Sequence, residues 1–284
     1  MPRVLNTLRE MPTPPRSKAP PIALSFIVPM YNESKRVAAS LREIAHYLDQ
    51  QPYESEIVLV DDGSSDDTAA IVQEAAGAIN LPVRLLRYSP NRGKGFALKV
   101  GFEAARGEVL VFSDCDLSTP VEELSRLLSA LEDADIAIGT RKAPGAKLVR
   151  RQPRLRESLG VVFTLIVRVL IASVSDATCG FKGFNRAVGK ELFSLQRIED
   201  WSFDAELLFN ARRRGHRVVE IPVRWEDRDG TKVKLPRDIV VTLMGIVKIR
   251  VYDFLGYYKK PLPVGDFSET DIGKIGRAAC RERG

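Results

Sequence analysis

An alternation between short apolar segments and amphipathic segments, repeated along the N-terminal half, is the feature that most constrains the fold of this chain. The apolar segments have the composition of strands covered on both faces of a sheet: residues 24–28, 56–60, 83–88 and 108–112. The first amphipathic segment repeats its apolar residues at the spacing of one helical face: Val37, Leu41, Ile44 and Leu48. We expect that helix to begin at Glu33, with Asn32 as its cap. The alternation predicts an α/β fold with a mostly parallel, doubly wound sheet and helices on both faces.

The fourth apolar segment is followed by two carboxylates. Asp114 and Asp116 are separated by one residue, so in an extended chain their side chains can face the same way. Two such carboxylates repel each other unless a cation lies between them, and Mg²⁺ favours one or two carboxylates together with substrate phosphate oxygens. Thr119 to Glu122 then has the pattern of a capping box, with Pro120 at the first helical position. We expect a metal-bound nucleotide diphosphate here, with an ordinary capping loop as the alternative.

Polar side chains also follow the other three expected strands. In chain order these are Tyr31 and Glu33, then Asp61 and Asp62, then Lys94. Because the carboxyl ends of parallel strands meet at one edge of a sheet, we expect these side chains to share a cleft with the two aspartates after the fourth strand. The cleft would hold acidic groups suited to a base and a ribose, a lysine suited to a phosphate, and the metal site.

Four motifs, in the same order along the chain, resemble those of the family 2 glycosyltransferases of the GT-A fold: residues 28–33 (VPMYNE), 60–64 (VDDGS), 91–95 (NRGKG) and 114–116 (DCD). The resemblance covers roughly residues 24–258. It implies a Rossmann-like GT-A domain, a nucleotide-sugar donor and a divalent cation, Mg²⁺ or Mn²⁺. It also implies donor binding by Pro29, Tyr31, Glu33, Asp61, Lys94, Asp114 and Cys115. By the same resemblance Asp61 contacts the uracil or guanine base, and the cation is held by Asp114 and Asp116.

Three later segments are similar to those of dolichyl-phosphate β-glucosyltransferases: residues 176–182 (DATCGFK), 199–206 (EDWSFDAE) and 223–232 (VRWEDRDGTK). The related mannosyltransferases match these segments less well. The resemblance implies an inverting transfer of glucose from UDP-glucose to a polyprenyl phosphate, with GDP-mannose or another nucleotide sugar as the alternative donor. The identity of the sugar rests on the resemblance alone. The eukaryotic enzymes open with a membrane-spanning helix, whereas residues 1–22 here are polar and Pro-rich, and we expect a disordered leader.

A run of basic residues that contains no acidic residue indicates an anionic partner: Arg141, Lys142, Lys147, Arg150, Arg151, Arg154 and Arg156. A lipid phosphate arrives already ionised, because its second pKa is about 6. It therefore needs no general base to remove a proton, but cations to hold it. Arginine suits this task through its forked geometry. We expect acceptor-phosphate binding by Arg150, Arg151 and Lys182, and a catalytic set of Asp116, Arg141 and Asp204. Four roles remain open for Asp204: a general base, a contact to the sugar, a group that orients an acceptor-side arginine, and a plain helix cap. Trp201 and Phe203 either stack on a sugar or pack within the protein.

Two apolar segments are candidates for contact with a membrane surface, at residues 159–174 and 239–258. The first is too short to span a bilayer comfortably, and charged residues within the second argue against a crossing. Basic residues beside both are typical of helices that lie in the membrane surface, with core or dimer helices as the alternative. We expect a GT-A domain at 23–236, an amphipathic membrane-surface or dimer helix at 237–260, and a tail at 261–284 whose last residues, 274–284, resemble a non-native remnant.

The three cysteines, Cys115, Cys179 and Cys280, follow no metal-ligand spacing, which favours a reducing compartment. We therefore expect a peripheral enzyme on the cytoplasmic face of a membrane, with a second copy of the chain as a further candidate partner. Three rivals remain: a transferase with a soluble acceptor, a nucleotidyltransferase, and a nucleic-acid-binding module. A nucleotidyltransferase usually has a Gly-rich N-terminal pyrophosphate loop, whereas residues 24–33 contain no glycine, which counts against that class. The basic run lacks the interleaved aromatic residues on which bases stack, which counts against a nucleic-acid-binding module, so no nucleic acid is expected as a partner. An inactive scaffold is a last alternative.

Overall fold

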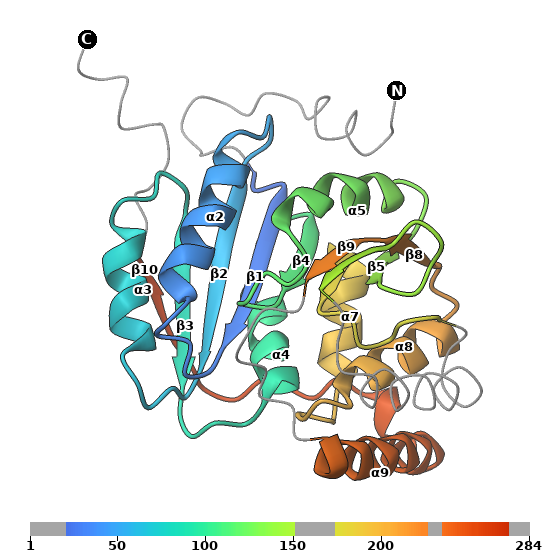
Figure 1. Ribbon diagram of the computed structural model, residues 1–284. Coiled ribbons are helices and arrows are strands. Elements are labelled where there is room, and N and C mark those ends of the chain that lie inside the picture. Colours follow the sequence, from blue (N-terminus) through green and yellow to red (C-terminus); the bar gives the residue numbers. More distant parts are fainter. Residues whose placement is uncertain (1–20, 151–173, 227–234, 273–284) are drawn as a thin grey trace.

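The computed structural model describes residues 21–150, 174–226 and 235–272, and its centre is one mixed sheet (Figure 1). Four parallel strands lie side by side in the order β3-β2-β1-β4: β1 (Leu24–Met30), β2 (Ser55–Asp62), β3 (Val83–Tyr88) and β4 (Val109–Ser113). Each agrees with a predicted strand to within two residues at either end. The predicted parallel α/β core is therefore confirmed.

Four further strands complete the sheet: β5 (Ile136–Thr140), β7 (Phe181–Asn185), β8 (Val218–Pro222) and β10 (Ser268–Asp271). β7 lies antiparallel between β4 and β5, whereas β8 runs parallel to β5 at one edge. β10 lies antiparallel to β3 at the other edge. A separate parallel pair is formed by β6 (Lys147–Arg150) and β9 (Arg224–Glu226). The sheet is thus mostly parallel with two antiparallel strands.

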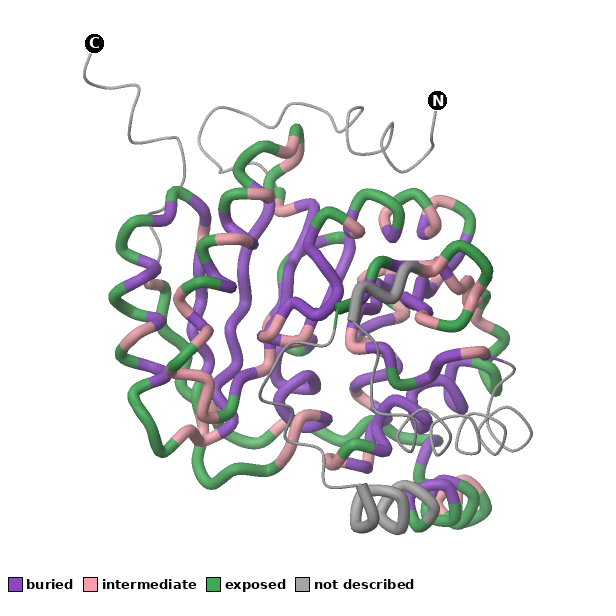
Figure 2. Tube along the Cα trace, viewed as in Figure 1, coloured by how far each residue is buried: buried purple, intermediate pink, exposed green. Residues whose placement is uncertain are grey.

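Helices cover both faces of the sheet, as predicted, and the strands between them are buried (Figures 1 and 2). One core is closed by α2 (Val37–Asp49), α3 (Thr68–Ala76) and α5 (Leu124–Ala130). The other is closed by α4 (Lys94–Ala104), α7 (Arg186–Leu195), α8 (Phe203–Arg213) and α9 (Leu235–Phe254). Successive residues of β1 point to opposite cores, Phe26 and Val28 to the first and Ile27 to the second. This alternation explains why the strands are apolar throughout.

Two predicted helix starts are wrong. α2 begins at Val37 rather than Glu33, and Asn32 has a positive φ of 52° instead of capping the helix. The Asn32 side chain accepts the Ser65 N–H at 2.9 Å, so contacts with the loop after β2 outcompete a cap. After β4, the expected capping box is instead the short 3₁₀ helix η1 (Val121–Glu123), with no side-chain cap bond. Pro120 is extended there, with ψ 145°, and α5 begins only at Leu124.

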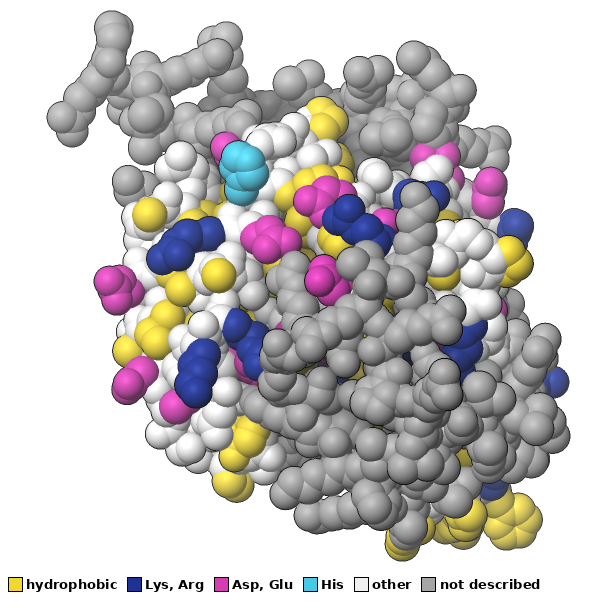
Figure 3. All heavy atoms as spheres, viewed as in Figure 1, with side chains coloured by type: hydrophobic (Ala, Val, Ile, Leu, Met, Phe, Trp, Pro, Cys, Tyr) yellow, Lys and Arg dark blue, Asp and Glu magenta, His cyan; other side chains and the backbone are white. Residues whose placement is uncertain are grey.

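The outer face of α9 carries hydrophobic side chains, which protrude at the lower right of Figure 3, where Figure 1 shows this helix. Its inner face contributes Ile246 and Ile249 to the core beside α8. A 3₁₀ helix, η2 (Tyr257–Lys259), follows and buries Tyr258. Within the described ranges, the structure contains no helix with both the length and the apolarity needed to cross a bilayer.

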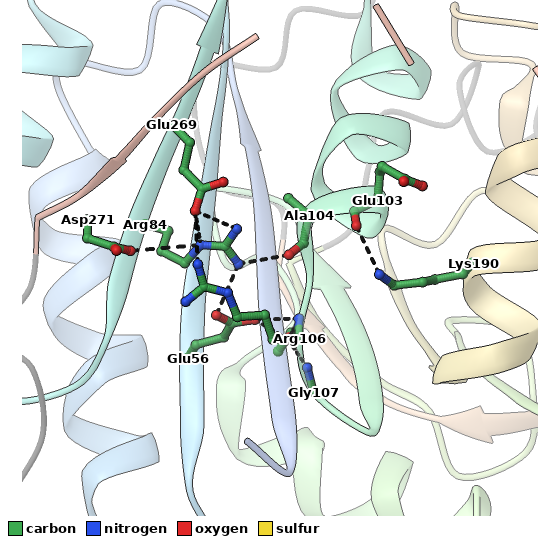
Figure 4. Close-up of polar contacts among 10 residues, drawn as sticks. Glu56, Arg84, Glu103, Ala104, Arg106, Gly107, Lys190, Glu269 and Asp271 are labelled. Carbon is green, nitrogen blue, oxygen red and sulfur yellow. Dashed lines mark hydrogen bonds and ion pairs between the residues drawn. The ribbon is translucent and has the colours of Figure 1, made fainter. Parts of the chain in front are cut away.

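A buried charge cluster joins the C-terminal strand to the amino-terminal edge of the sheet (Figure 4). Arg84 of β3 is 2% exposed and donates to Glu56 Oε2 at 3.1 Å, to Glu269 Oε1 at 2.7 Å and to the Ala104 carbonyl at 2.9 Å. Arg106 also donates to Glu269, at 3.1 Å. Because a buried guanidinium needs such partners, these contacts fix β10 to the edge of the sheet, although its own four residues are exposed.

Candidate active site

The ends of β1, β2 and β4 meet the start of α4 at one edge of the sheet (Figure 1). The register of β1 and β2 extends to Asp61, so the predicted donor-binding residues of the two strands are neighbours. Pro29 is half-buried, and Tyr31 is 39% exposed just beyond β1. The Glu33 carboxylate pairs with Arg36, with 2.9 Å between Oε2 and Nε. The topology therefore brings these predicted positions together, and their contacts with a donor stay a prediction.

Asp61 is buried, and both of its carboxylate oxygens are bonded within the protein. Oδ2 accepts the Arg87 Nε–H at 3.0 Å, and Oδ1 accepts the Ser64 N–H at 2.9 Å. Arg87 leaves 46% of its side chain exposed at the same edge. Asp61 thus organises the loop after β2 in addition to its predicted role toward the base.

Asp62 has a structural role that the sequence reasoning missed. Its carboxylate accepts the Arg92 N–H at 2.8 Å, the Gly93 N–H at 2.9 Å, the Tyr88 hydroxyl at 2.8 Å and the Asn91 amide at 2.7 Å. Burial raises the pKa of Asp62 despite these donors. With every oxygen engaged, Asp62 fixes the loop before Lys94 rather than facing a ribose.

Lys94 lies against Asp114 at the centre of the candidate site. Its Nζ is 2.5 Å from Asp114 Oδ1 and 5.7 Å from the centroid of the Trp201 ring. Burial acts to lower the pKa of Lys94, but the carboxylates of Asp114 and Asp204 outweigh burial and raise it. The ammonium therefore stays charged beside a carboxylate that is 40% exposed.

Two glycines allow the loop that carries Lys94 to approach the loop before α8. Gly93 has a φ of 109°, and a Cβ there would lie 2.7 Å from the Glu199 carbonyl oxygen. The Gly95 N–H donates to the same carbonyl at 2.9 Å. A side chain at either position would push Lys94 away from its partners. The motif at residues 91–95 is thus explained by close backbone packing.

Asp114 and Asp116 follow β4 in a turn in which Leu117 has a φ of 49°. The Asp116 carboxylate accepts the Ser118 N–H at 2.9 Å and is half-buried. The Cys115 side chain between them points into the core, 5% exposed, where burial raises the pKa of its thiol. Cys115 can therefore meet a donor only through its backbone. Gly180 matters as well, because a Cβ there would overlap Asp114 Oδ2.

The donor set after β4 fits a hard divalent cation that shares its coordination with a substrate. Asp114 and Asp116 supply carboxylate oxygens, which Mg²⁺ and Mn²⁺ prefer. Among the residues that the structure describes, no group of three or more His, Cys, Asp or Glu side chains could hold a metal by itself. A cation here would need further ligands, such as diphosphate oxygens, and the metal site expected from the sequence stays a prediction.

Lys182 lies behind the site rather than at its surface, which corrects its predicted role. It is 1% exposed and donates to the Asp204 carboxylate at 2.6 Å and to the Cys179 carbonyl at 2.5 Å. Burial raises the pKa of Asp204, although Lys182 and Lys94 act to lower it. β7 places Lys182 between β4 and β5, so it cannot reach an acceptor phosphate directly in this structure. It positions Asp204 instead.

Arg141, at the end of β5, is held by a partner that the sequence reasoning did not single out. Its guanidinium makes a forked pair with Asp176, with Nε–Oδ2 and Nη2–Oδ1 distances of 2.7 Å. Arg141 lowers the pKa of Asp176 to about 2 against the opposing effect of burial. Nη2 also donates to Thr178, and the guanidinium lies 5.4 Å from the centroid of the Trp225 ring. With 21% of its side chain exposed, Arg141 offers a rigidly held cation.

The other predicted acceptor residues are only partly described. Arg150 belongs to β6, but its side chain lies outside what the structure describes, as does all of Arg151. Their role stays a prediction. Phe203 is fully buried in the core, whereas Trp201 is 48% exposed above Lys94. Of the two aromatic residues, only Trp201 can stack on a substrate.

Sequence comparisons give the chain a family. Residues 25–193 match the family described as Glycosyl transferase family 2. A dolichyl-phosphate beta-glucosyltransferase of Trichomonas vaginalis is 33% identical over 94% of this chain and 86% of its own length. The enzymes of that name from Saccharomyces cerevisiae and Homo sapiens are 33% and 31% identical, over 84% and 76% of this chain and 77% and 71% of their own.

Solved structures share the architecture at lower identity. Mannosyl-3-phosphoglycerate synthase from Rubrobacter xylanophilus has a TM-score of 0.62 at 17% identity, covering 86% of this chain and 78% of that one. Glucosyl-3-phosphoglycerate synthase from Mycobacterium tuberculosis, in complex with Mn²⁺, UDP-glucose and phosphoglyceric acid, has a TM-score of 0.61 at 17% identity, covering 80% and 79%. These structures agree in fold with the sheet described above. Because the family match covers more than half of the sequence and the relatives span most of it, the chain belongs to glycosyl transferase family 2 and is a glycosyltransferase.

Proposed function

We propose that this glycosyltransferase moves glucose from UDP-glucose to a polyprenyl phosphate of the dolichyl type, with inversion at the sugar carbon, at the cytoplasmic face of a membrane. The acceptor is supported by the names of the three relatives reported above, each a dolichyl-phosphate beta-glucosyltransferase. The donor is supported by those names and by the UDP-glucose bound to a solved structure of the same fold.

The observation that carries the proposal is the pairing of the acceptor-side carboxylate. Asp204 is bonded to Lys182 at 2.6 Å, and the pair is buried. A sugar hydroxyl would need a carboxylate base to take its proton, whereas a phosphate monoester is already an anion at neutral pH. Arg141, forked onto Asp176, offers the fixed cation that such an anion needs. An ionised acceptor therefore fits this site better than a hydroxyl.

On the donor side, Asp114 and Asp116 would hold Mg²⁺ or Mn²⁺. When bound, the cation neutralises the charge that develops on the departing diphosphate. Lys94, 2.5 Å from Asp114, adds a second positive charge at the same edge. Tyr31 and Glu33 would lie along the nucleotide.

In the proposed reaction an acceptor phosphate oxygen forms a bond to the anomeric carbon while the bond from that carbon to UDP breaks, and the bonding electrons leave with UDP. No proton has to be removed from the acceptor. The protein residues hold the two anions in line and offset their repulsion, with Lys94 on the donor side and Arg141 on the acceptor side. Arg150 and Arg151 would add cations on the acceptor side.

A panel of substrates tests the proposal. The purified full chain is incubated with UDP-glucose, GDP-mannose or other UDP- and GDP-sugars, each with a short polyprenyl phosphate or with 3-phosphoglycerate, and with or without Mn²⁺ or Mg²⁺. We expect a chloroform-soluble glucolipid from UDP-glucose only when the cation is present, with a β anomeric signal by NMR. Preference for GDP-mannose would overturn the donor, and a water-soluble glucosyl product would overturn the lipid acceptor.

A further inference from the structure

We infer that α9 docks the protein on the surface of an anionic bilayer, through a stripe of apolar side chains on its outer face. The inference rests on the proposed function, because a polyprenyl phosphate acceptor resides in a membrane. The observations behind it are independent of that function, and they concern the side chains of residues 244–254 of α9 and of the turn that follows.

The helix has two faces of different character. Its inner face packs on α8, with Ile246 3% and Ile249 0% exposed. Its outer face, together with the residue that follows the helix, exposes large apolar side chains: Met244 (56%), Val247 (63%), Val251 (46%), Phe254 (90%) and Leu255 (55%). At ~100° per residue these side chains cover an arc of about 100°, the width of one apolar helix face. Hydrophobic side chains protrude at this corner of the molecule in Figure 3.

Basic side chains flank the stripe. Lys248 lies beside one border of the arc and Arg250 beside the other, and both are exposed. The Arg250 guanidinium lies 5.7 Å from the centroid of the Phe209 ring, with its charge at the edge of the stripe. Lys259 and Lys260 extend the basic border beyond the helix. An apolar arc between cations is the arrangement of helices that lie in the headgroup region of a membrane.

A basic cavity of about 220 Å³ lies at the same end of α9. Arg213, Arg214 and Lys259 line it together with Asp253, which pairs with Arg213. Asn210 also lies in its wall, fully buried, and neither polar atom of its side chain has a hydrogen-bond partner among the described residues. The cavity lies on the inner side of α9, where Arg213 pairs with Asp253 and Arg214 with Glu191, so it is separate from the outer stripe and adds cationic groups at the same end of the helix.

Charge distinguishes a bilayer from a second copy of the chain. If two copies packed stripe against stripe about a twofold axis, the basic borders of one would face those of the other. The acidic residue of α9 within the described part, Asp253, is already paired with Arg213 and cannot compensate. Anionic headgroups supply the complementary charge along both borders. The bilayer is therefore the occupant that the charges favour.

The docked helix also touches the acceptor side of the site. A Cβ at Gly245 would overlap the Ser202 side chain, so α9 and the start of α8 are in direct contact. Ser202 lies between Trp201 and Asp204 in the chain. In Figure 1, α9 lies toward the end of the molecule to which β1 and β2 point. A bilayer under α9 would therefore present a lipid phosphate close to these acceptor-side residues.

The test measures partitioning of the full chain onto vesicles. Wild type, V247E/F254E and the matched control A70E/Q73E, which adds the same charge to exposed positions of α3, are floated with vesicles of phosphatidylcholine containing 30 mol% phosphatidylserine, and with phosphatidylcholine alone. We expect wild type and the control to bind the anionic vesicles more strongly than the neutral ones. V247E/F254E should bind at least tenfold more weakly, with UDP binding by calorimetry unchanged.

Vesicle binding by V247E/F254E equal to that of wild type would overturn the inference. So would light scattering that shows a wild-type dimer, dissociated by V247E/F254E, with no vesicle binding by either protein, because the stripe would then be a dimer interface. The proposed function fails separately, if no glucolipid forms from any acceptor while vesicle binding persists. Transfer to a short, water-soluble prenyl phosphate by V247E/F254E at the wild-type rate would confirm that the stripe acts on access to lipid.

Discussion

Charges of alternating sign run through the site at the scale of single residues. Lys182 pairs with Asp204, Lys94 pairs with Asp114, and the two pairs interact, since Asp204 raises the pKa of Lys94. Charges removed from water are tolerated when each has a partner of the opposite sign, and removal of one partner leaves another uncompensated. Each of these side chains therefore supports the next as well as the substrate. A substitution in this set should therefore change both the free energy of unfolding and the turnover number, and the ratio of the two effects should differ between positions.

Asp116→Asn should strongly reduce transfer while the fold is retained. The carboxylate is half-buried and has one described hydrogen bond, to the Ser118 N–H, which an amide oxygen can also accept. Loss of a charged ligand should weaken cation-assisted binding of UDP and lower kcat by about 10²–10³-fold. Calorimetry of UDP with Mn²⁺, thermal unfolding and product assays would measure this, with Asp67→Asn at the exposed cap position of α3 as control. A variant with normal turnover would remove the argument for the metal.

Lys182→Met should destabilise the protein and also reduce turnover. The substitution leaves Asp204 buried at 5% exposure without its ammonium partner, a situation that costs about 3–5 kcal/mol in other buried pairs. In the double variant with Asp204→Asn the two effects should be far less than additive, because the uncompensated charge is gone. Urea unfolding of the four proteins in the cycle would measure the coupling. Additive effects would show that the two side chains act independently.

Local patterns predicted which loops meet at this edge of the sheet, while the roles of their residues toward a donor stay predictions, and long-range pairing limited the prediction elsewhere. Asp114 directly follows β4, Asp116 lies two residues further on, and Lys94 opens the helix after β3, so their places at this edge could be predicted from apolar runs visible in the sequence. The burial of Lys182 follows from β7 lying antiparallel between β4 and β5, which no spacing discloses. The same holds for Asp176, which is adjacent to Arg141 only because β5 and the segment before β7 converge.

At the scale of elements, α9 and the start of α8 form one unit. Gly245 permits their contact, and Tyr258 in η2 donates its hydroxyl to Glu206 of α8 at 2.8 Å. Arg197 donates to the Tyr257 and Lys260 carbonyls, which ties the loop before α8 to the same turn. The apolar pattern indicated a helix in this part of the sequence, but not the surface on which it packs. Packing against this surface requires a glycine at position 245, because the Ser202 side chain leaves no room for a Cβ there.

Gly245→Ala should therefore loosen α9 from α8. The added Cβ would overlap the Ser202 side chain, so one of the helices must shift, and overpacking of this kind typically costs about 1–3 kcal/mol. Because Ser202 is close to Asp204 in α8, transfer should fall more than UDP affinity does. Chemical unfolding and lipid-acceptor kinetics would measure both effects. Gly77→Ala, where a Cβ would make an ordinary 3.4 Å contact, serves as the matched control.

Shortening Ser202 distinguishes a local clash from a general intolerance of change in α9. Ser202→Gly in the Gly245→Ala background removes both atoms that the new methyl group would meet. We expect partial recovery of stability and of transfer, limited by the lower helix propensity of glycine. Failure of the double variant to recover either property would refute the proposed contact.

At the scale of the whole molecule, buried ionisable groups couple the C-terminal part of the chain to pH. Glu206 is 0% exposed and accepts the Arg197 and Ile198 N–H groups and the Tyr258 hydroxyl, so it joins α8 to the preceding loop and to η2. Burial raises its pKa from an ordinary 4.5 to about 7. Lys99 in α4 responds in the opposite direction, since burial lowers its pKa from 10.5 to about 8. Glu206 ends the segment at residues 199–206 that resembles the glucosyltransferases, but the sequence does not disclose its burial, and Lys99 lies in none of the quoted motifs.

The free energy of unfolding should consequently decrease as pH rises from about 4.5 to 7. In this window the folded protein keeps a proton on Glu206 that the unfolded chain releases, so stability from this group is complete below pH 4.5 and is lost as pH approaches the folded pKa. The loss is at most about 3 kcal/mol, from the size of the shift. Lys99 adds the converse, a gain in stability between about pH 8 and 10.5, where the folded protein has released its proton and the unfolded chain has not.

Glu206→Gln isolates the first effect, because an amide keeps a hydrogen-bond acceptor and cannot ionise. Urea unfolding at pH 5, 6, 7 and 8 should show a falling stability in wild type and in Glu103→Gln, whose exposed carboxylate on α4 serves as the control. The Glu206→Gln profile should be flatter by about 2–3 kcal/mol between pH 5 and 7. Parallel profiles for all three proteins would show that Glu206 is ionised at similar pH in the folded and unfolded chains, and the attachment of η2 to α8 would then not depend on its protonation.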